Sequence, residues 1–284
     1  MPIYDLGYRH WKGKPLAGER RWWTITRAGV GMLVRRRNFL ILLVISLVPF
    51  IIRGGMLYAF FFSEQLHFRL PPFFKLDESF YYDFLKWQLF WIFVMLMYAG
   101  SGLVANDLRS NALQIYFSKP IRRIDYLAGK LGILGTFILA VTLLPGWLLF
   151  LIHMLFAGDG QLLQQKAWIA VSILLFSLLM ALINGMLMLA FSSFSRNSRF
   201  AGLVFFAFYF FSESVYGLLR VISRDTNWAF CSLKNNYLRV GEAIFGLPSS
   251  FNMPVWPSVL VLSVLGAASF LVLYWRIRPV EVVK

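Results

Sequence analysis

Residues 104 to 130 read Val104-Ala-Asn-Asp-Leu-Arg-Ser-Asn-Ala-Leu-Gln-Ile-Tyr-Phe-Ser-Lys-Pro-Ile-Arg-Arg-Ile-Asp-Tyr-Leu-Ala-Gly-Lys130, a polar interruption between two long apolar segments. The first half predicts a short helix, because apolar residues recur at helical spacing at Leu108, Ala112 and Ile115. Ser118-Lys119-Pro120 ends this helix, since proline lacks an amide donor and disfavours a helical residue before it. A second helical turn, with Ile121, Ile124 and Ala128 on one side, leads into the next apolar segment. A connection that only joins two membrane spans does not need such order, whereas one that transmits force to another protein does.

The composition is that of an integral membrane protein. Of 284 residues, 59% are hydrophobic and 14% are charged. The net charge of +15 would suggest nucleic-acid binding in a soluble chain, but the basic residues collect in alternate loops, so we expect no nucleic-acid partner. The single cysteine, Cys231, excludes an internal disulfide and a cysteine metal cluster. We expect no removable signal peptide, because the first 37 residues are charged and lack a small-residue cleavage site.

Six segments are long enough to cross a hydrocarbon core, which needs roughly 20 residues. They lie at about 39–62, 87–105, 131–156, 168–192, 200–221 and 256–275. Most of the 28 lysines and arginines lie in the N-terminal segment, in the 106–130 and 193–199 loops and at the C-terminus. Because positively charged loops stay in the cytoplasm, both termini and the 104–130 stretch are predicted to be cytoplasmic. The sequence thus predicts an all-α, multi-pass protein whose residues 39–284 form one six-helix transmembrane domain.

The segments outside these spans carry patterns of their own. Residues 1–38 mix arginines with Trp22, Trp23, Ile25, Val30 and Leu33, which predicts an amphipathic interfacial helix with basic side chains toward anionic lipid; the alternative is a charged tail that only orients the first span. Residues 63–86 carry Pro71-Pro72 and an aromatic run. Residues 222–255 contain a stretch, 233–245, with helical spacing that is too short to span, which predicts outer surface or re-entrant helices between the last two spans.

The motifs of common enzymes are missing from the sequence. There is no Gly-x-x-x-x-Gly-Lys-Ser/Thr loop for ATP and no Gly-x-Ser-x-Gly elbow. The three histidines, His10, His67 and His153, lie far apart in different compartments. We therefore expect no catalytic residue, no metal site and no cofactor in this chain.

The layout resembles the membrane (permease) subunit of a type-2 ABC exporter. The most specific stretch runs from Ala112 to Lys130, where an apolar helix is followed by Ser-Lys-Pro, a basic turn and Gly-Lys at the start of span three. Family members often have Gly-Thr just before this helix, whereas this chain has Asn111-Ala112. The resemblance implies that 106–117 form a coupling helix that docks on a separate ATPase, with 119–125 as the turn behind it. The coupling residues it implies are Asn106, Asp107, Leu108, Arg109, Asn111, Ala112, Ile115, Tyr116, Lys119, Pro120, Arg122 and Arg123; the alternative is a basic loop that only enforces topology.

The resemblance also implies an assembly and a mechanism. Two copies of an ABC ATPase, which hold ATP and Mg, would pair with two permease subunits as a homodimer or heterodimer in a bacterial inner membrane. ATP binding would pull on both coupling helices and rock the spans toward an outward-open state. Residues of a translocation path would include Arg53, Phe206, Tyr209, Phe210, Glu213 and Ser214, although phenylalanines facing lipid are the alternative for span five. Nothing in the sequence names a substrate.

Arg53 and Glu213 are predicted to pair. Both lie roughly 20 Å from the inner boundary at about 1.5 Å per residue, and a lone charge at that depth is costly. The alternative is that Arg53 reaches outward while Glu213 bonds to Ser212, Ser214 or Arg220. Two other functions also remain open. The chain could be an ABC-type subunit that supports envelope assembly, motility or metal-centre maturation without exporting a small solute, or it could be an intramembrane enzyme.

Overall fold

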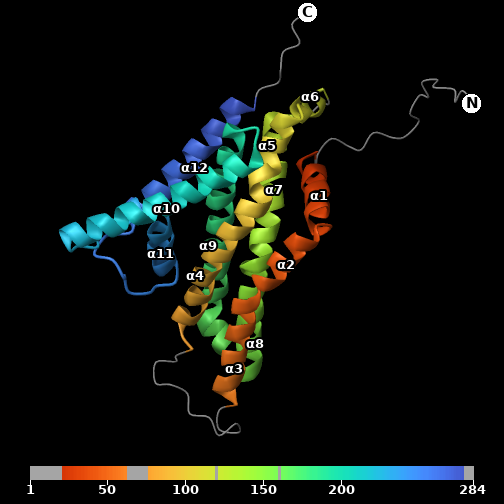
Figure 1. Ribbon diagram of the computed structural model, residues 1–284. Helices are drawn as coiled ribbons and strands as arrows, with labels where there is room; N and C mark the ends of the chain where they lie inside the picture. Colours follow the sequence, from red (N-terminus) through yellow and green to blue (C-terminus); the bar gives the residue numbers. More distant parts are fainter. Residues whose placement is uncertain (1–20, 63–75, 119–120, 159–160, 278–284) are drawn as a thin grey trace, which may run out of the picture.

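The computed structural model describes residues 21–62, 76–118, 121–158 and 161–277, and in these ranges the chain is helical, without strands (Figure 1). Six helical segments are long and apolar enough to cross a membrane: Arg37–Phe61, Glu78–Arg109, Arg123–Ala157, Lys166–Phe194, Ser198–Ser223 and Trp256–Arg276. The predicted multi-pass, all-α fold with six spans is therefore confirmed.

The second span begins nine residues earlier than predicted. Helix α4 (Glu78–Met95) starts at Asp77, whose carboxylate accepts a hydrogen bond from the Ser79 amide and so caps the helix. The later part of the aromatic run that we assigned to an outer loop, from Phe80 to Phe84, lies in its first two turns, and Phe80, Tyr81 and Phe84 are buried. Glu78, Asp83 and Lys86, together with two tyrosines, lower the local hydropathy, which is why the sequence pattern missed this part of the span. Residues 63–75 lie outside the described ranges.

Prolines divide two of the spans into paired helices. The first consists of α2 (Arg37–Ile45) and α3 (Val48–Phe61), with Pro49 at the junction. The third consists of α7 (Arg123–Val141) and α8 (Leu143–Ala157), with Pro145 in the first turn of α8. Proline has no amide to bond the carbonyl four residues back, so the ladder is interrupted at both places. At the first break, Gln88 of α4 donates to the Ser46 carbonyl at 3.1 Å, which satisfies a backbone group that lipid could not.

Helix α9 (Gln161–Phe194) is the axis of the bundle (Figure 1). It contacts α4, α5 (Ser101–Arg109), α7, α8, α10 (Ser198–Ser223) and α12 (Trp256–Arg276). Between α4 and α5 the second span contains one π-helical turn, Leu96–Gly100, a form that is frequent at functional sites. The Gly100 Cα faces Met188 of α9 so closely that an added Cβ would lie 2.5 Å from the Met188 Cγ.

A helix is present in the N-terminal segment, α1 (Arg21–Val34), and it is packed along α7. Its predicted position in the headgroup layer stays a prediction, and residues 1–20 lie outside the described ranges. Thr26 Oγ1 donates to the Gly129 carbonyl at 3.1 Å, and Ile25 lies against Gly129 while Gly29 lies against Ile133. Because the contacts advance by four residues on both helices, α1 and α7 run side by side in the same direction. The seam depends on glycine: a Cβ on Gly129 would lie 2.7 Å from the Ile25 Cβ.

We expect Gly129→Ala to loosen α1 from the bundle. The new methyl group would overlap Ile25, and overpacking of this kind costs about 1–3 kcal/mol. The matched control is Gly135→Ala on the same helix, where a Cβ meets nothing within 4 Å and alanine favours the helix. Proteolysis within α1 and the thermal unfolding midpoint measure the difference. Equal behaviour of the two variants would show that the seam does not hold α1.

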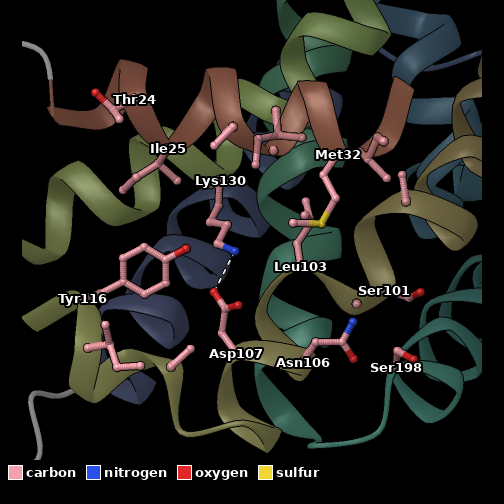
Figure 2. Close-up of a pocket in the computed structure, with 18 of the residues that line it drawn as sticks. Thr24, Ile25, Met32, Ser101, Leu103, Asn106, Asp107, Tyr116, Lys130 and Ser198 are labelled. Carbon is pink, nitrogen blue, oxygen red and sulfur yellow. Dashed lines mark ion pairs between the residues drawn. The ribbon is translucent and has the colours of Figure 1, made fainter. Parts of the chain in front are cut away.

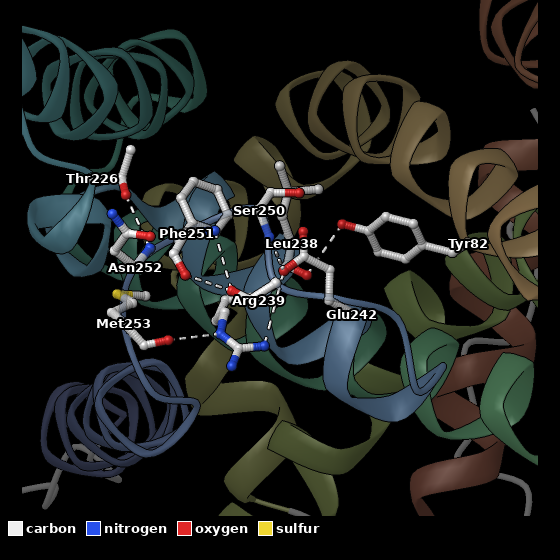
Figure 3. Close-up of polar contacts among 10 residues, drawn as sticks. Tyr82, Thr226, Leu238, Arg239, Glu242, Ser250, Phe251, Asn252 and Met253 are labelled. Atoms are coloured by element: carbon white, nitrogen blue, oxygen red, sulfur yellow. Dashed lines mark hydrogen bonds and ion pairs between the residues drawn. The ribbon is translucent and has the colours of Figure 1, made fainter.

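The segment between the last two spans folds as a 3₁₀ turn, Asn227–Cys231, and helix α11 (Leu233–Ile244). Twelve residues make about 18 Å, too short to cross a bilayer, as predicted. The helix is tucked among α4, α9, α10 and α12 rather than lying beyond their ends. Polar contacts fix it there (Figure 3): Tyr82 donates to the Leu238 carbonyl at 3.1 Å, Arg239 Nε donates to the Met253 carbonyl at 3.0 Å, and Glu242 accepts from the Ser250 amide at 3.2 Å.

Candidate functional site

The predicted coupling helix is shorter than expected. Residues 106–109 belong to α5, the end of the second span, and the separate helix is α6 (Ala112–Phe117). Asn111 divides the two with a φ of 52°, a left-handed conformation that asparagine tolerates better than most residues. The predicted stripe of Leu108, Ala112 and Ile115 therefore does not form one face of one helix. Lys119 and Pro120 lie outside the described residues.

Helix α6 points one apolar side chain inward and another outward. Leu113 is buried in the core, whereas Ile115 is 65% exposed. Leu108 is partly buried against the core, so it does not share the exposed surface. At the start of α7, the Asp125 carboxylate accepts from the Arg122 amide at 3.1 Å, Ile124 is 60% exposed, and the Arg123 guanidinium lies 5.5 Å from the centre of the Tyr274 ring on α12. We call α6 with the first turn of α7 the α6 surface.

A buried ion pair ties this surface to two spans (Figure 2). The Lys130 ammonium on α7 lies 2.6 Å from Asp107 Oδ2 on α5, and both side chains are largely buried. Tyr126 OH donates to the same carboxylate oxygen at 2.7 Å. The Lys130 ammonium also lies 5.8 Å and 5.3 Å from the centres of the Tyr116 and Tyr126 rings, which gives cation–π contacts. Since Tyr116 belongs to α6, one charge pair joins α5, α6 and α7.

The rings of Tyr116 and Tyr126 pack edge to face with centres 5.3 Å apart. Burial, and then the negative charge of Asp107, raise the pKa of Tyr116 above its usual value. A phenol with its usual pKa of about 10 is already neutral at physiological pH. The raised pKa extends the neutral range of Tyr116, which is part of the aromatic packing around Lys130. These contacts hold α6 rigidly to the ends of the two spans.

Sequence reasoning missed Lys130, Tyr126 and Leu113 as site residues. A signal for the first was present, because Asp107 follows the end of span two by two residues and Lys130 precedes span three by one. Opposite charges at the same depth on consecutive spans predict a pair. Nothing in the sequence predicted the burial of Leu113, because its direction depends on the left-handed residue Asn111, which separates α5 from α6.

A cavity of about 720 Å³ opens beside the ion pair, between α1 on one side and α5, α6 and α7 on the other (Figure 2). Five predicted coupling residues line it: Asn106, Asp107, Ala112, Ile115 and Tyr116. Arg109 and Asn111 are exposed outside it. Five of the twelve predicted coupling residues therefore lie together in the wall of this cavity.

The predicted pair of Arg53 and Glu213 is wrong within this chain. Arg53 lies 3.7 Å from Asp83 and 4.9 Å from the centre of the Phe80 ring, both on α4. Glu213 lies 3.6 Å from the Lys234 ammonium and accepts a hydrogen bond from the Ser232 hydroxyl. Helices α3 and α10 are not packed on each other, and α10 leans away from the bundle (Figure 1), so counting residues along each helix could not identify the partners of the two charges.

The other residues that we predicted for a translocation path do not lie together either. Phe206 and Phe210 are 45% and 64% exposed on the outer face of α10, with parallel rings 5.9 Å apart. Tyr209 points inward, with its ring centre 4.8 Å from that of Phe93, and Ser214 bonds to the Phe210 carbonyl at 2.9 Å. Within one chain these residues form no common site. Glu213 accepts from Ser232 in the turn that begins α11, and the neighbouring Ser212 hydroxyl, which was not a predicted path residue, accepts from the Leu233 amide.

Comparison with known protein families identifies the family to which this chain belongs. Residues 23–234 match the model of the ABC-2 family transporter proteins, and this range runs from α1 through all of the first five spans and the α6 surface. The chain belongs to the ABC-2 transporter family. A search of curated proteins found no match. This ABC-2 protein is therefore a multi-pass permease subunit, the membrane component of an ABC transporter, which confirms the predicted family.

Proposed function

We propose that this ABC-2 permease is the membrane half of an ATP-driven exporter and that the α6 surface docks on its ATPase. Two ATPase copies would bind ATP and Mg and hydrolyse the nucleotide, and a second permease subunit, identical or related, would complete the pathway. The observation that carries this proposal is the combination of an exposed apolar residue, Ile115, with a rigid attachment of its helix to two spans. Ile124 in the first turn of α7 is also exposed, so the α6 surface presents two apolar side chains among charged ones.

The rigidity explains how docking would move the spans. A force applied to a flexible loop would be absorbed by the loop. Here Leu113 anchors α6 in the core, and the Lys130–Asp107 pair joins its base to α5 and α7. A displacement of α6 would therefore tilt spans two and three together, and α1 would follow because it is packed on α7.

The charge distribution supports a cytoplasmic position for the α6 surface. At the end of the bundle that carries α6 (Figure 1), α7 begins at Arg123, the start of α10 holds Arg199, and α12 ends at Arg276. Basic residues are retained on the cytoplasmic side, so both termini would lie in the cytoplasm and the membrane would be a bacterial inner membrane.

Purification of the complex tests the function. The tagged chain, co-expressed with an ABC ATPase, should retain the ATPase through purification and change its rate of ATP hydrolysis. A purified chain that turns over a lipid or peptide substrate without any ATPase would instead favour an intramembrane enzyme. A complex that hydrolyses ATP only with an envelope protein present would favour the non-transport role.

Cys231 reports the orientation, because it is the only thiol in the chain. With the proposed topology it lies outside, and a membrane-impermeant maleimide should label it in intact spheroplasts. Partial burial raises its pKa, so less thiolate is present at neutral pH and labelling should be faster at pH 9 than at pH 7. A Cys231→Ser chain is the control for background. Labelling that appears only after the cytoplasmic side is opened would reverse the topology.

A further inference from the structure

The cavity between α1 and the α6 surface has the features of a ligand site that docking of an ATPase on Ile115 does not explain. Its volume of about 720 Å³ is within the range of small-molecule pockets. Its α1 wall is apolar between two arginines, with Ile25, Met32 and Leu33 separating Arg21 from Arg36. At about 1.5 Å per residue, these arginines mark the two ends of a cavity some 20 Å long.

The charge of the lining favours an anion. Asp107 is the only carboxylate among the lining residues, and Lys130 neutralises it. Neither Arg21 nor Arg36 has a carboxylate within ion-pair distance among the described residues. Within the described ranges two positive charges of the cavity therefore lack a counterion, and arginine is well suited to phosphate.

The position of Arg36 relates the cavity to the membrane. Arg36 directly precedes α2, where the first span begins, and Tyr98 lines the same end of the cavity. The Tyr98 ring stacks on Phe39 of α2 at 6.0 Å. Beyond this point Leu40 and Ile41 are exposed on α2, so an apolar surface continues from the cavity mouth along the span. A phosphate at Arg36 would thus have room for acyl chains on one side and for a headgroup on the other.

The inner part of the cavity offers partners for hydroxyl groups. Both contacts of the Asp107 carboxylate, from Lys130 and Tyr126, end on Oδ2, and Asp107 lines the cavity (Figure 2). Its Oδ1 is then an acceptor for a hydroxyl donor. Ser101, Asn106 and Ser198 also line the cavity and supply further polar groups.

We propose that this cavity binds an anionic phospholipid with a hydroxyl-bearing headgroup, such as phosphatidylglycerol, from the adjacent leaflet. Arg36 holds the phosphate, the headgroup enters between α1 and α5, and the acyl chains lie along Tyr98 and α2. Ile115 lines the cavity and also belongs to the proposed docking surface, but the groups assigned to the lipid lie on α1, α2 and α5. Lipid binding is therefore measured on the chain without an ATPase, and its outcome is separate from that of the proposed function.

Native mass spectrometry of the full chain in neutral detergent tests the proposal. The probes are phosphatidylglycerol, phosphatidylcholine and glycerol 3-phosphate. We expect one tightly bound phosphatidylglycerol, with phosphatidylcholine and glycerol 3-phosphate each at least tenfold weaker. Arg36→Gln should weaken phosphatidylglycerol about tenfold, because a charge-assisted hydrogen bond is lost. The matched control is Arg35→Gln, which removes the same charge from a neighbouring arginine outside the lining and should change binding less than threefold.

A second variant keeps the test decisive if Arg36→Gln unfolds. Ala28 lines the cavity from α1, and Ala28→Trp should fill it and weaken phosphatidylglycerol about tenfold without removing a charge. Equal losses in Arg35→Gln and Arg36→Gln would mean general attraction to a basic surface and would overturn the site. Binding of glycerol 3-phosphate as tight as that of the lipid would identify a soluble anion as the occupant, and equal binding of phosphatidylcholine would remove the role of charge; either result contradicts the proposal.

Discussion

Ile115→Asp is expected to lower the amount of ATPase that co-purifies with the chain at least tenfold. The side chain is 65% exposed on α6, so the change leaves the fold of the permease intact while placing a carboxylate where an apolar group would enter the partner. Burial of an unpaired carboxylate in an interface costs several kcal/mol, and each 1.4 kcal/mol is about tenfold in affinity. The ratio of ATPase to permease after affinity purification measures the effect.

The control for this variant is on the same helix. Gln114 is exposed on α6 and already polar, so Gln114→Asp adds the same charge without removing an apolar contact. It should retain at least half of the bound ATPase. Leu108→Asp is not a useful variant, because Leu108 is packed against the core. If Ile115→Asp retains as much ATPase as Gln114→Asp, Ile115 is not a docking residue.

Lys130→Met should have the opposite effect to Ile115→Asp. It should lower the stability of the permease strongly and the amount of bound ATPase only slightly. Removal of the ammonium leaves the Asp107 carboxylate buried and unpaired, which costs about 3–5 kcal/mol. The thermal unfolding midpoint should fall by about 5–10 °C. Ile115 remains exposed, so the chain that folds should still bind the ATPase within twofold.

The double variant separates charge from packing. Asp107→Asn removes the unpaired charge and keeps an oxygen that can accept the Tyr126 hydrogen bond. Lys130→Met with Asp107→Asn should therefore regain most of the midpoint lost by Lys130→Met alone. A double variant as unstable as the single variant would mean that Lys130 acts by filling space beside Tyr116 and Tyr126, and not by pairing with Asp107.

The features that depend on length and hydropathy were predictable from the sequence. Six spans, the short α11 helix and an ordered connection between spans two and three all follow from the number and spacing of apolar residues. The coupling helix was placed too early because Leu108, Ala112 and Ile115 fit a helical period, and a periodic pattern does not register a single left-handed residue such as Asn111.

The ion-pair partners of side chains on different helices were harder to predict from the sequence. Depth can be counted along a helix, but the direction of a side chain depends on how each helix is rotated, and this is set by packing. Arg53 and Glu213 were matched by counting residues along their helices, yet α3 and α10 are not packed on each other: Arg53 faces Asp83 of α4, and Glu213 faces Lys234 of α11. The Lys130–Asp107 pair was more predictable, because a short connection forces the ends of spans two and three together.

Photo-crosslinking from α6 tests the central claim most directly. Ile115→Cys in a Cys231→Ser chain is modified with a benzophenone maleimide and irradiated in the complex with its ATPase. Trp228→Cys in the same background is the control, since Trp228 is also exposed but lies in the turn that follows the far end of α10. A crosslink to the ATPase from position 115 and none from position 228 is the predicted result. An intact complex with no crosslink from position 115, or equal crosslinks from both positions, would contradict docking on α6.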